Sequence, residues 1–198
     1  MNSIAILASG SGTNAENIIR YFNNHPFIRV TLVATNNPNA YVIERAKIMA
    51  VPVVVFSMEE LQNGVLLKLL KVNSIDLIVL AGFIKLVPEC VVNAFPRRIV
   101  NIHPALLPAY GGKGMYGDRV HEAVIANGDK ESGITIHYVN NRYDEGDIIF
   151  QAKCEVNPTD TPATLAQKVH QLEYQHYPGV IESLLTGMRY AELPQKGK

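Results

Sequence analysis

Short apolar runs alternate with amphipathic segments along the first half of the chain. The apolar run over residues 3–8 is followed at once by Ser9-Gly10-Ser11-Gly12, which is typical of a buried parallel strand that ends in a tight turn. Four further apolar runs follow, each separated from the last by a segment with apolar residues at helical spacing. We therefore expect strands over residues 3–8, 27–35, 52–56, 76–81 and 98–102, with helices over residues 14–23, 41–49, 59–72 and 88–94 between them.

This alternation of strand and helix predicts the fold class. A strand that returns parallel to its predecessor needs a right-handed crossover, and the crossover helices then cover the sheet. We expect an α/β fold with a doubly wound, mostly parallel Rossmann-like sheet and helices on both faces. Chemistry is expected on the loops at the carboxyl ends of the strands, where such sheets form their crevices.

The pattern changes after residue 130. Residues 133–139 and 147–156 read as two strands around a polar stretch, which predicts an antiparallel β-hairpin at the far side of the sheet. A long helix is expected from Thr161 to about Thr186, with Thr161 or Asp160 as its N-terminal cap. Pro178 lies inside this helix and is expected to kink or break it.

Length and linker composition predict a single domain over residues 1–198. No linker is long enough to divide the chain. Only the residues from about Gln195 look frayed.

The charge balance limits the choice of partners. Eighteen basic residues offset eighteen acidic ones, so there is no overall positive field of the kind that attracts nucleic acid or membrane surfaces. Small-molecule substrates are expected, with the protein a monomer or homodimer. There is no basic leader and no run of eighteen apolar residues, so we expect a cytoplasmic protein.

The cysteines and histidines do not indicate a metal site. Cys90 and Cys154 stand alone without the spacing of a zinc site or a disulfide framework, and both are expected to be buried thiols. The histidines on other predicted elements have no carboxylate partners at ligand spacing. They are His121, His137, His170 and His176.

The glycine turn after the first strand indicates an anion site. Residues 10–15 satisfy the pattern G-x-G-x-x-G/A between a strand and a helix, where backbone N–H groups and the helix dipole converge. A dinucleotide site would need an acid at the end of the second strand, but Asn36 and Asn37 stand there. A phosphate monoester is the favoured guest, and a merely tight turn remains the alternative.

A second polar group ends the fifth predicted strand. Alternation places Asn101 and His103 on one side of this strand and Ile102 on the other. An amide donor beside an imidazole can stabilise charge on a carbonyl oxygen and exchange a proton near neutral pH. Taken alone, this pair is also compatible with a structural histidine or a metal ligand.

Four separated motifs, one of which begins at this strand end, resemble the family of phosphoribosylglycinamide formyltransferases, which use folate. They are SGSGTN at 9–14, AGFIKLVP at 81–88, NIHPALLPAY at 101–110 and YDEGDIIFQAKC at 143–154. The resemblance covers nearly the whole chain in the family's order. It implies a phosphate-binding Rossmann-like half over residues 1–100 and a catalytic, folate-binding half over residues 101–198.

The resemblance also assigns roles to single residues. The catalytic trio is Asn101, His103 and Asp144, the phosphate of glycinamide ribonucleotide is held by Gly12, Thr13 and Asn14, and its ribose is held by Glu173. The folate pocket is formed by Phe83, Ile84, Lys85, Leu86 and Val87, with Val139 closing its other side. The implied co-substrate is 10-formyltetrahydrofolate, and no metal is implied.

The run Gly111–Gly117 is rich in glycine, and we expect a mobile flap there with Lys113 as an anion contact. Rival readings are a hydrolase of formyl folate, a methionyl-tRNA formyltransferase, and a non-catalytic nucleotide-binding or nicotinamide-dependent module. The last of these explains the glycine turn but leaves the spacing of Asn101, His103 and Asp144 as coincidence.

Overall fold

The computed structural model describes residues 1–187 and contains one seven-stranded sheet with seven helices in that range. The strands are β1 (Asn2–Leu7), β2 (Ile28–Thr35), β3 (Val53–Val55), β4 (Leu77–Leu80), β5 (Ile99–His103), β6 (Glu131–Tyr138) and β7 (Ile148–Glu155). The helices are α1 (Thr13–Phe22), α2 (Val42–Ile48), α3 (Met58–Gln62), α4 (Val65–Val72), α5 (Glu89–Ala94), α6 (Asp118–Asn127) and α7 (Pro162–Thr186).

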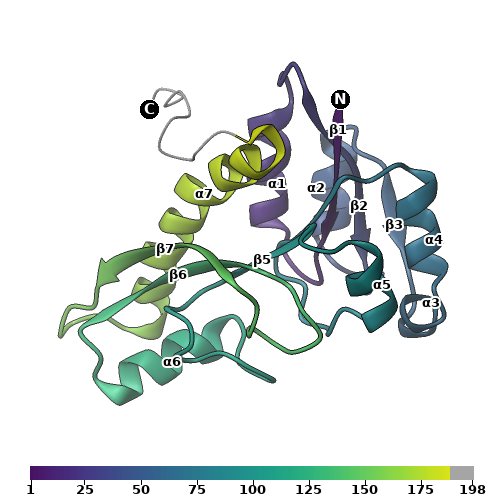
Figure 1. Ribbon diagram of the computed structural model, residues 1–198. Helices are drawn as coiled ribbons and strands as arrows, with labels where there is room; N and C mark the ends of the chain where they lie inside the picture. The colour runs from purple at the N-terminus through teal and green to yellow at the C-terminus, as the bar shows by residue number, and fades with distance from the viewer. Residues whose placement is uncertain (188–198) are drawn as a thin grey trace.

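The strand order is β3-β2-β1-β4-β5-β6-β7 (Figure 1). The first five strands in this order are parallel to one another, β6 is antiparallel to β5, and β7 is antiparallel to β6. The predicted doubly wound sheet and its terminal hairpin are therefore confirmed. The winding direction reverses between β1 and β4. A crevice forms at the carboxyl ends of strands where the order reverses in this way.

Helices cover both faces of the sheet, each over its own core. On one face, Ile18 of α1, Val124 of α6 and Val169 of α7 belong to a single buried cluster. On the other face, Leu66 of α4 and Val91 of α5 belong to a second one. A parallel sheet buried on both sides needs apolar residues at successive positions, which is why β1 and β4 read as continuous apolar runs.

One helical prediction was wrong, and one helix was missed. The expected helix over residues 59–72 is divided into α3 and α4, because Gly64 adopts a left-handed conformation with φ of 85° between them. Ser57 and Glu60 form a capping box that fixes the start of α3. The helix α6, which carries His121, was not expected from the sequence.

The helix α7 continues through Pro178 rather than breaking there. Proline has no N–H to donate to the carbonyl four residues earlier, which belongs to Tyr174. The side chain of Asn17 on α1 donates to that carbonyl oxygen at 3.0 Å. A donor from the neighbouring helix thus replaces the missing backbone bond, while Thr161 caps the start of α7 as expected.

The expectation for the cysteines was also wrong. Cys90 is exposed in the short helix α5, and Cys154 is half-buried on the edge strand β7. Neither element is covered on all sides, so neither thiol lies in a core. The expected frayed segment from Gln195 lies outside the described residues. Among residues 1–187, no helix combines the length and the apolar character needed to cross a bilayer.

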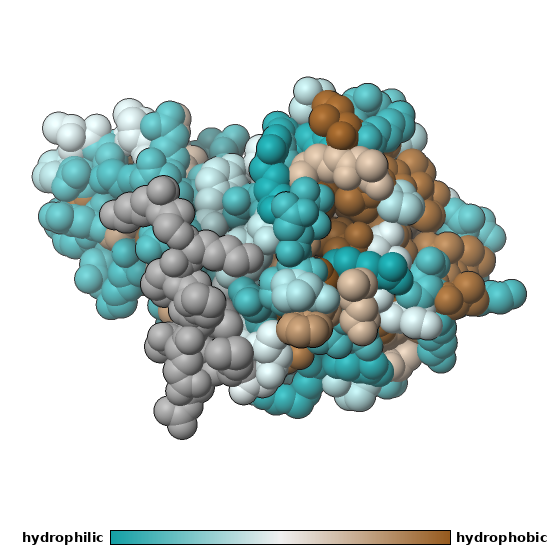
Figure 2. All heavy atoms as spheres, turned by 90° about the horizontal axis from the view of Figure 1, so that it is seen from above, coloured by the Kyte–Doolittle hydropathy of each residue, from teal (hydrophilic) through white to brown (hydrophobic). Residues whose placement is uncertain are grey.

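Seen from above, apolar residues gather over one side of the molecule and hydrophilic residues over the other (Figure 2). Met1 and Phe27, which are 75% and 66% exposed, lie next to each other where β1 and β2 begin. This apolar surface is at the amino ends of the parallel strands. It is therefore remote from the edge of the sheet at which the glycine turn lies.

Asn17→Ala should lower the free energy of unfolding by about 1 kcal/mol, because the carbonyl of Tyr174 loses its donor. In a Pro178→Ala background the same change should cost clearly less, since residue 178 then supplies its own N–H. Urea unfolding of the four proteins in this double-mutant cycle measures the coupling. Equal losses in both backgrounds would show that Asn17 does not compensate for the proline.

Candidate active site

A cavity of about 530 Å³ opens at the carboxyl ends of β1, β4 and β5. Its walls bring together segments far apart in the sequence. They are the turn Gly10–Asn14, residues 81–85, residues 101–104, the glycine-rich segment with Arg119, and the side chains of His121, Tyr143, Asp144, His170 and Glu173. The cavity has the size typical of small-molecule sites.

The glycine turn forms one wall, and its shape depends on Gly12. This residue has φ of 75°, and a Cβ atom there would lie 2.4 Å from Cγ2 of Val42. No backbone acceptor within the described residues engages the N–H groups of Ser11 and Gly12. The N-terminal N–H groups of α1 add to these free donors, so the turn presents an anion-binding surface to the cavity.

Asn101 and His103 form the opposite wall at the end of β5. Pairing with β4 on one side and β6 on the other fixes the strand, with Asn101 opposite Leu80 and His137. Ile102 packs into the core beneath α1 and α7, so the two polar side chains project to the other side as predicted. His103 is only 3% exposed.

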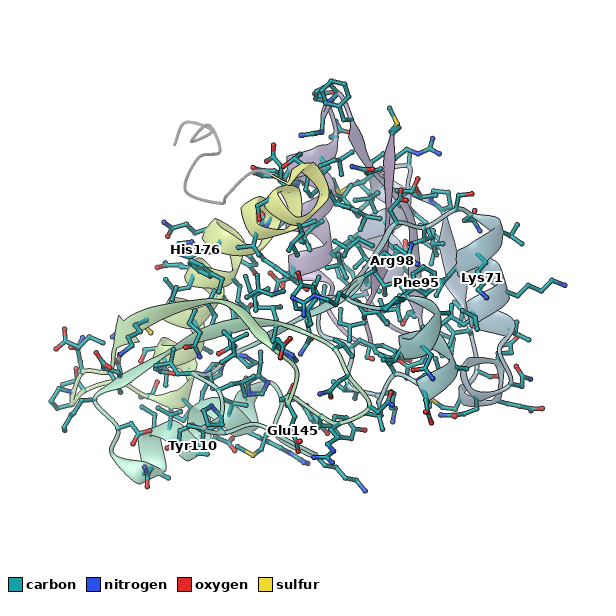
Figure 3. The ribbon with its side chains drawn as sticks, in the orientation of Figure 1. Lys71, Phe95, Arg98, Tyr110, Glu145 and His176 are labelled. Carbon is teal, nitrogen blue, oxygen red and sulfur yellow. The ribbon has the colours of Figure 1, made fainter. Side chains whose placement is uncertain are left out.

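Asp144 reaches this wall from the loop between β6 and β7. It adopts φ of 56°, a left-handed conformation that aspartate tolerates better than most residues. Gly146 allows the loop to approach the sheet, since a Cβ atom there would lie 1.7 Å from the carbonyl oxygen of Tyr138. This explains the D-x-G spacing. Glu145 between them is exposed and lies in the lower half of the molecule in Figure 3.

The carboxylate of Asp144 holds the site residues together. Its Oδ2 accepts from the backbone N–H of Gly112 at 2.9 Å and lies 3.5 Å from Nδ1 of His103. Its Oδ1 lies 3.4 Å from Nδ2 of Asn101 and 3.6 Å from Nε2 of His137. The carboxylate of Asp144 therefore lies within 3.5 Å of both Asn101 and His103, the other two residues of the expected trio.

The hydrogen bonds of His103 define its proton positions. Nε2 lies 2.8 Å from the carbonyl oxygen of Tyr110, which can only accept, so Nε2 carries a proton. Nδ1 is then the nitrogen that gains or loses a proton, and it faces Asp144. Tyr110 lies beside α6 (Figure 3), and its hydroxyl donates to Asp129 at 2.6 Å, which anchors the carbonyl that holds His103.

His137 orients the amide of Asn101. Its Nδ1 lies 2.8 Å from the carbonyl oxygen of Tyr138 and must donate to it, so in the neutral ring Nε2 accepts from Nδ2 of Asn101 at 3.1 Å. The other N–H of this amide points to Asp144. The chain of bonds from Tyr138 through His137 therefore fixes which atom of Asn101 is the donor.

The pKa values of the two ionisable partners are both lowered, but for different reasons. Burial lowers the pKa of His103, and the nearby carboxylate of Asp144 opposes that shift. For Asp144, burial raises the pKa, but the neighbouring imidazoles of His137 and His103 and the N–H of Gly112 outweigh it and lower the pKa overall. The pair thus combines an ionised carboxylate with a neutral imidazole that can receive a proton.

Glu173 of α7 lines the cavity close to the glycine turn. It is 6% exposed and accepts a hydrogen bond from Nδ2 of Asn14 at 2.8 Å. Burial raises its pKa, and the bond from Asn14 opposes the shift. The expected phosphate and ribose contacts, Gly12, Thr13, Asn14 and Glu173, therefore lie together in the cavity wall.

The expected folate residues are divided by the structure. Phe83, Ile84 and Lys85 line the cavity, whereas Leu86 does not. Val87 is buried in the core on the α5 face, and Val139 packs against that core while its N–H donates to Ile99. Only the first three therefore have side chains or backbone at the cavity.

The glycine-rich segment contributes cations. Lys113 and Arg119 line the cavity with Lys85, and among residues 1–187 no acidic partner lies in contact with any of the three. Arg119 lies 5.2 Å from the ring centroid of Tyr116. These positive charges face the same space as the anion-binding turn, which suits a substrate with several negative groups.

The sequence did not indicate that His137, His121 and His170 belong to the site region. His121 comes from α6, the unexpected helix, and lies with His170 in the cavity wall, where burial lowers its pKa. Its Nδ1 has no hydrogen-bond partner. The alternating pattern of β6 placed His137 on the strand, but only the pairing with Asn101 shows its role. Within the described residues, no group of three metal-ligating side chains is present.

Comparison with known proteins agrees with this geometry. The family model described as formyl transferase matches residues 2–181. The chain belongs to the formyl transferase family. Within that family, the phosphoribosylglycinamide formyltransferase of Bacillus subtilis is 36% identical over 93% of this chain and 95% of its own length.

Two further members of the family extend the comparison. The chloroplastic phosphoribosylglycinamide formyltransferase of Arabidopsis thaliana is 40% identical over 91% of this chain, and this chain spans 64% of that protein's length. The crystal structure of phosphoribosylglycinamide formyltransferase from Bacillus halodurans has a TM-score of 0.85 at 36% identity, covering 98% of this chain and 100% of that one. The formyltransferase fold is therefore confirmed.

Gly12→Ala should lower the free energy of unfolding by about 2 to 3 kcal/mol, because the new methyl group would overlap Val42. Gly10→Ala is the matched control in the same turn, since a Cβ atom there meets nothing within 4 Å. It should change stability by no more than about 0.5 kcal/mol. Similar losses in urea unfolding for both variants would contradict the close approach of the turn to α2.

Asp144→Asn should lower the pKa of His103 further, because it removes the carboxylate that favours the charged imidazole. The ring would then stay neutral to lower pH. An NMR titration of the histidine side chains measures this, with His103→Gln identifying the signal. A pKa that is unchanged or raised would show that the carboxylate does not act on Nδ1.

Proposed function

We propose that this protein transfers the formyl group of 10-formyltetrahydrofolate to the amine of glycinamide ribonucleotide, a step of de novo purine biosynthesis. The observation that carries the proposal is the contact of one carboxylate, Asp144, with both Asn101 and His103 across a cavity from the anion-binding turn. The names of the related proteins support this acceptor.

In this proposal residues 1–198 form one domain with two roles. Residues 1–100 provide the phosphate site, where Gly12, Thr13 and Asn14 hold the phosphate of the ribonucleotide, and Glu173 from α7 binds the ribose. Residues 101–198 provide the catalytic trio and folate contacts. On the folate side, Phe83, Ile84 and Lys85 supply side chains and backbone groups at the cavity, and Val87 and Val139 pack in the core behind them.

The trio would act on the tetrahedral species formed when the amine attacks the formyl carbon. Negative charge develops on the formyl oxygen and positive charge on the nitrogen. Nδ2 of Asn101 can exchange its long contact with Asp144, 3.4 Å, for a bond to that oxygen. The fixed orientation of the amide by His137 means that this donor needs no reorganisation.

Proton transfer would pass through the His103 and Asp144 pair. Nδ1 of His103 lacks a proton in the neutral ring, and a proton released by the attacking nitrogen would be stabilised there by the carboxylate 3.5 Å away. The same pair would then return the proton to the departing folate nitrogen as its bond to carbon breaks. The products are the formylated amine and tetrahydrofolate.

Substitution of the trio tests this assignment. Asn101→Ala, His103→Ala and Asp144→Asn should each lower turnover at least about a hundredfold, since losing one such donor typically costs roughly 3 to 4 kcal/mol in the barrier. Release of tetrahydrofolate under saturating substrates measures turnover, and Glu145→Gln, an exposed neighbour in the same loop, is the control. A near-normal rate in any of the three would remove that residue from the trio.

A hydrolase of formyl folate is the nearest rival, because it needs a similar trio with water as the acceptor. An assay of the protein with 10-formyltetrahydrofolate alone, and then with glycinamide ribonucleotide added, distinguishes the two activities. Acceptor-dependent release of folate supports the transferase, whereas release without acceptor indicates the hydrolase. Absence of release in both favours a binding module.

The proposal retains the remaining expectations from the sequence. The partners are the two small-molecule substrates, with no nucleic acid or membrane, in a monomer or homodimer. No metal takes part. We place the activity in the cytoplasm, although two plant relatives carry chloroplastic names.

A further inference from the structure

A charged side chain outside the cavity contacts the side of the glycine turn that faces away from the cavity. Nε of Arg45 on α2 donates to the carbonyl oxygen of Ser11 at 2.9 Å. Its guanidinium also bonds the carboxylate of Glu16 in the first turn of α1. Arg45 is not among the residues that line the cavity, so it touches the turn only from behind.

The same helix holds a second carbonyl of the turn. The backbone N–H of Val42 donates to the carbonyl oxygen of Gly10 at 3.2 Å. In a trans peptide plane the C=O of one residue and the N–H of the next point in opposite directions. Because α2 holds the carbonyls of Gly10 and Ser11, the N–H groups of Ser11 and Gly12 are directed away from α2, toward the cavity.

Arg45 also pairs with the carboxylate of Glu16, whose negative charge would otherwise oppose anion binding at the turn. Glu16 lies at the N-terminus of α1, the helix whose positive dipole end faces the cavity. Hydrogen bonds from Arg20 and then Arg45 lower the pKa of Glu16, so it is a carboxylate. A carboxylate without these partners would repel a phosphate at the turn.

We propose that Arg45 is a positioning residue for the phosphate of the ribonucleotide substrate. It acts through the turn, by holding the Ser11 carbonyl away from the anion and by pairing with Glu16. This inference rests on the proposed function, because it assigns a task to the site that binds the acceptor. It predicts an effect on acceptor binding that is separate from the chemical step.

Arg45→Gln should raise KM for glycinamide ribonucleotide about tenfold, which is the effect of losing one charge-assisted hydrogen bond. Turnover at saturation and KM for 10-formyltetrahydrofolate should stay near wild type. Arg45→Lys should recover part of the loss, because a single ammonium can serve the Ser11 carbonyl but not both partners. Arg20→Gln is the matched control, since Arg20 shares Glu16 but does not contact the turn.

Binding of inorganic phosphate, measured by calorimetry on wild type and Arg45→Gln, distinguishes a failure of the positioning role of Arg45 from a failure of the proposed function. Weaker phosphate binding and a raised acceptor KM in Arg45→Gln, clearly larger than the changes in Arg20→Gln, support the positioning role. Equal losses in Arg20→Gln, or a fall in turnover and thermal stability without a change in acceptor KM, overturn it. If the wild type neither binds phosphate nor transfers a formyl group, the proposed function itself fails.

Discussion

The site depends on the position of one carboxylate, that of Asp144. It is 12% exposed, and its polar contacts within the described residues are the N–H of Gly112, the amide of Asn101, and the imidazoles of His103 and His137. A buried charge without such partners would cost several kcal/mol. The carboxylate therefore orders the segments that surround it, and those segments contribute the rest of the cavity.

Backbone geometry rather than side-chain chemistry brings these segments together. Gly146 is needed where the hairpin loop touches the carbonyl of Tyr138, and Gly12 is needed where the turn touches Val42. Both close approaches are at loops that bear polar groups, while the sheet beneath is apolar on both faces. The rigid sheet fixes the ends of β1 and β5, and the glycines allow two loops to reach them.

Two histidines adjacent to the carboxylate have different tasks because their second nitrogens have different partners. His103 donates to Tyr110 and leaves Nδ1 open toward Asp144, which suits proton exchange. His137 donates to Tyr138 and uses Nε2 to accept from Asn101, which suits orientation. The two tasks differ because the two rings donate to different backbone carbonyls, and the residue types alone would not distinguish the two histidines.

The sequence by itself determined the alternation of strands and helices, the hairpin and the glycine turn, because period and turn chemistry are local properties. The trio of Asn101, His103 and Asp144 was expected only from the resemblance of the motifs to a known family. The sequence did not determine that α7 passes through Pro178, that His137 orients Asn101, or that Arg45 holds the glycine turn. Each of these rests on a contact between residues distant in the chain: Asn17 with Tyr174, β5 with β6, and α2 with the turn. Such contacts arise only when the sheet has aligned its strands, and no local pattern records them.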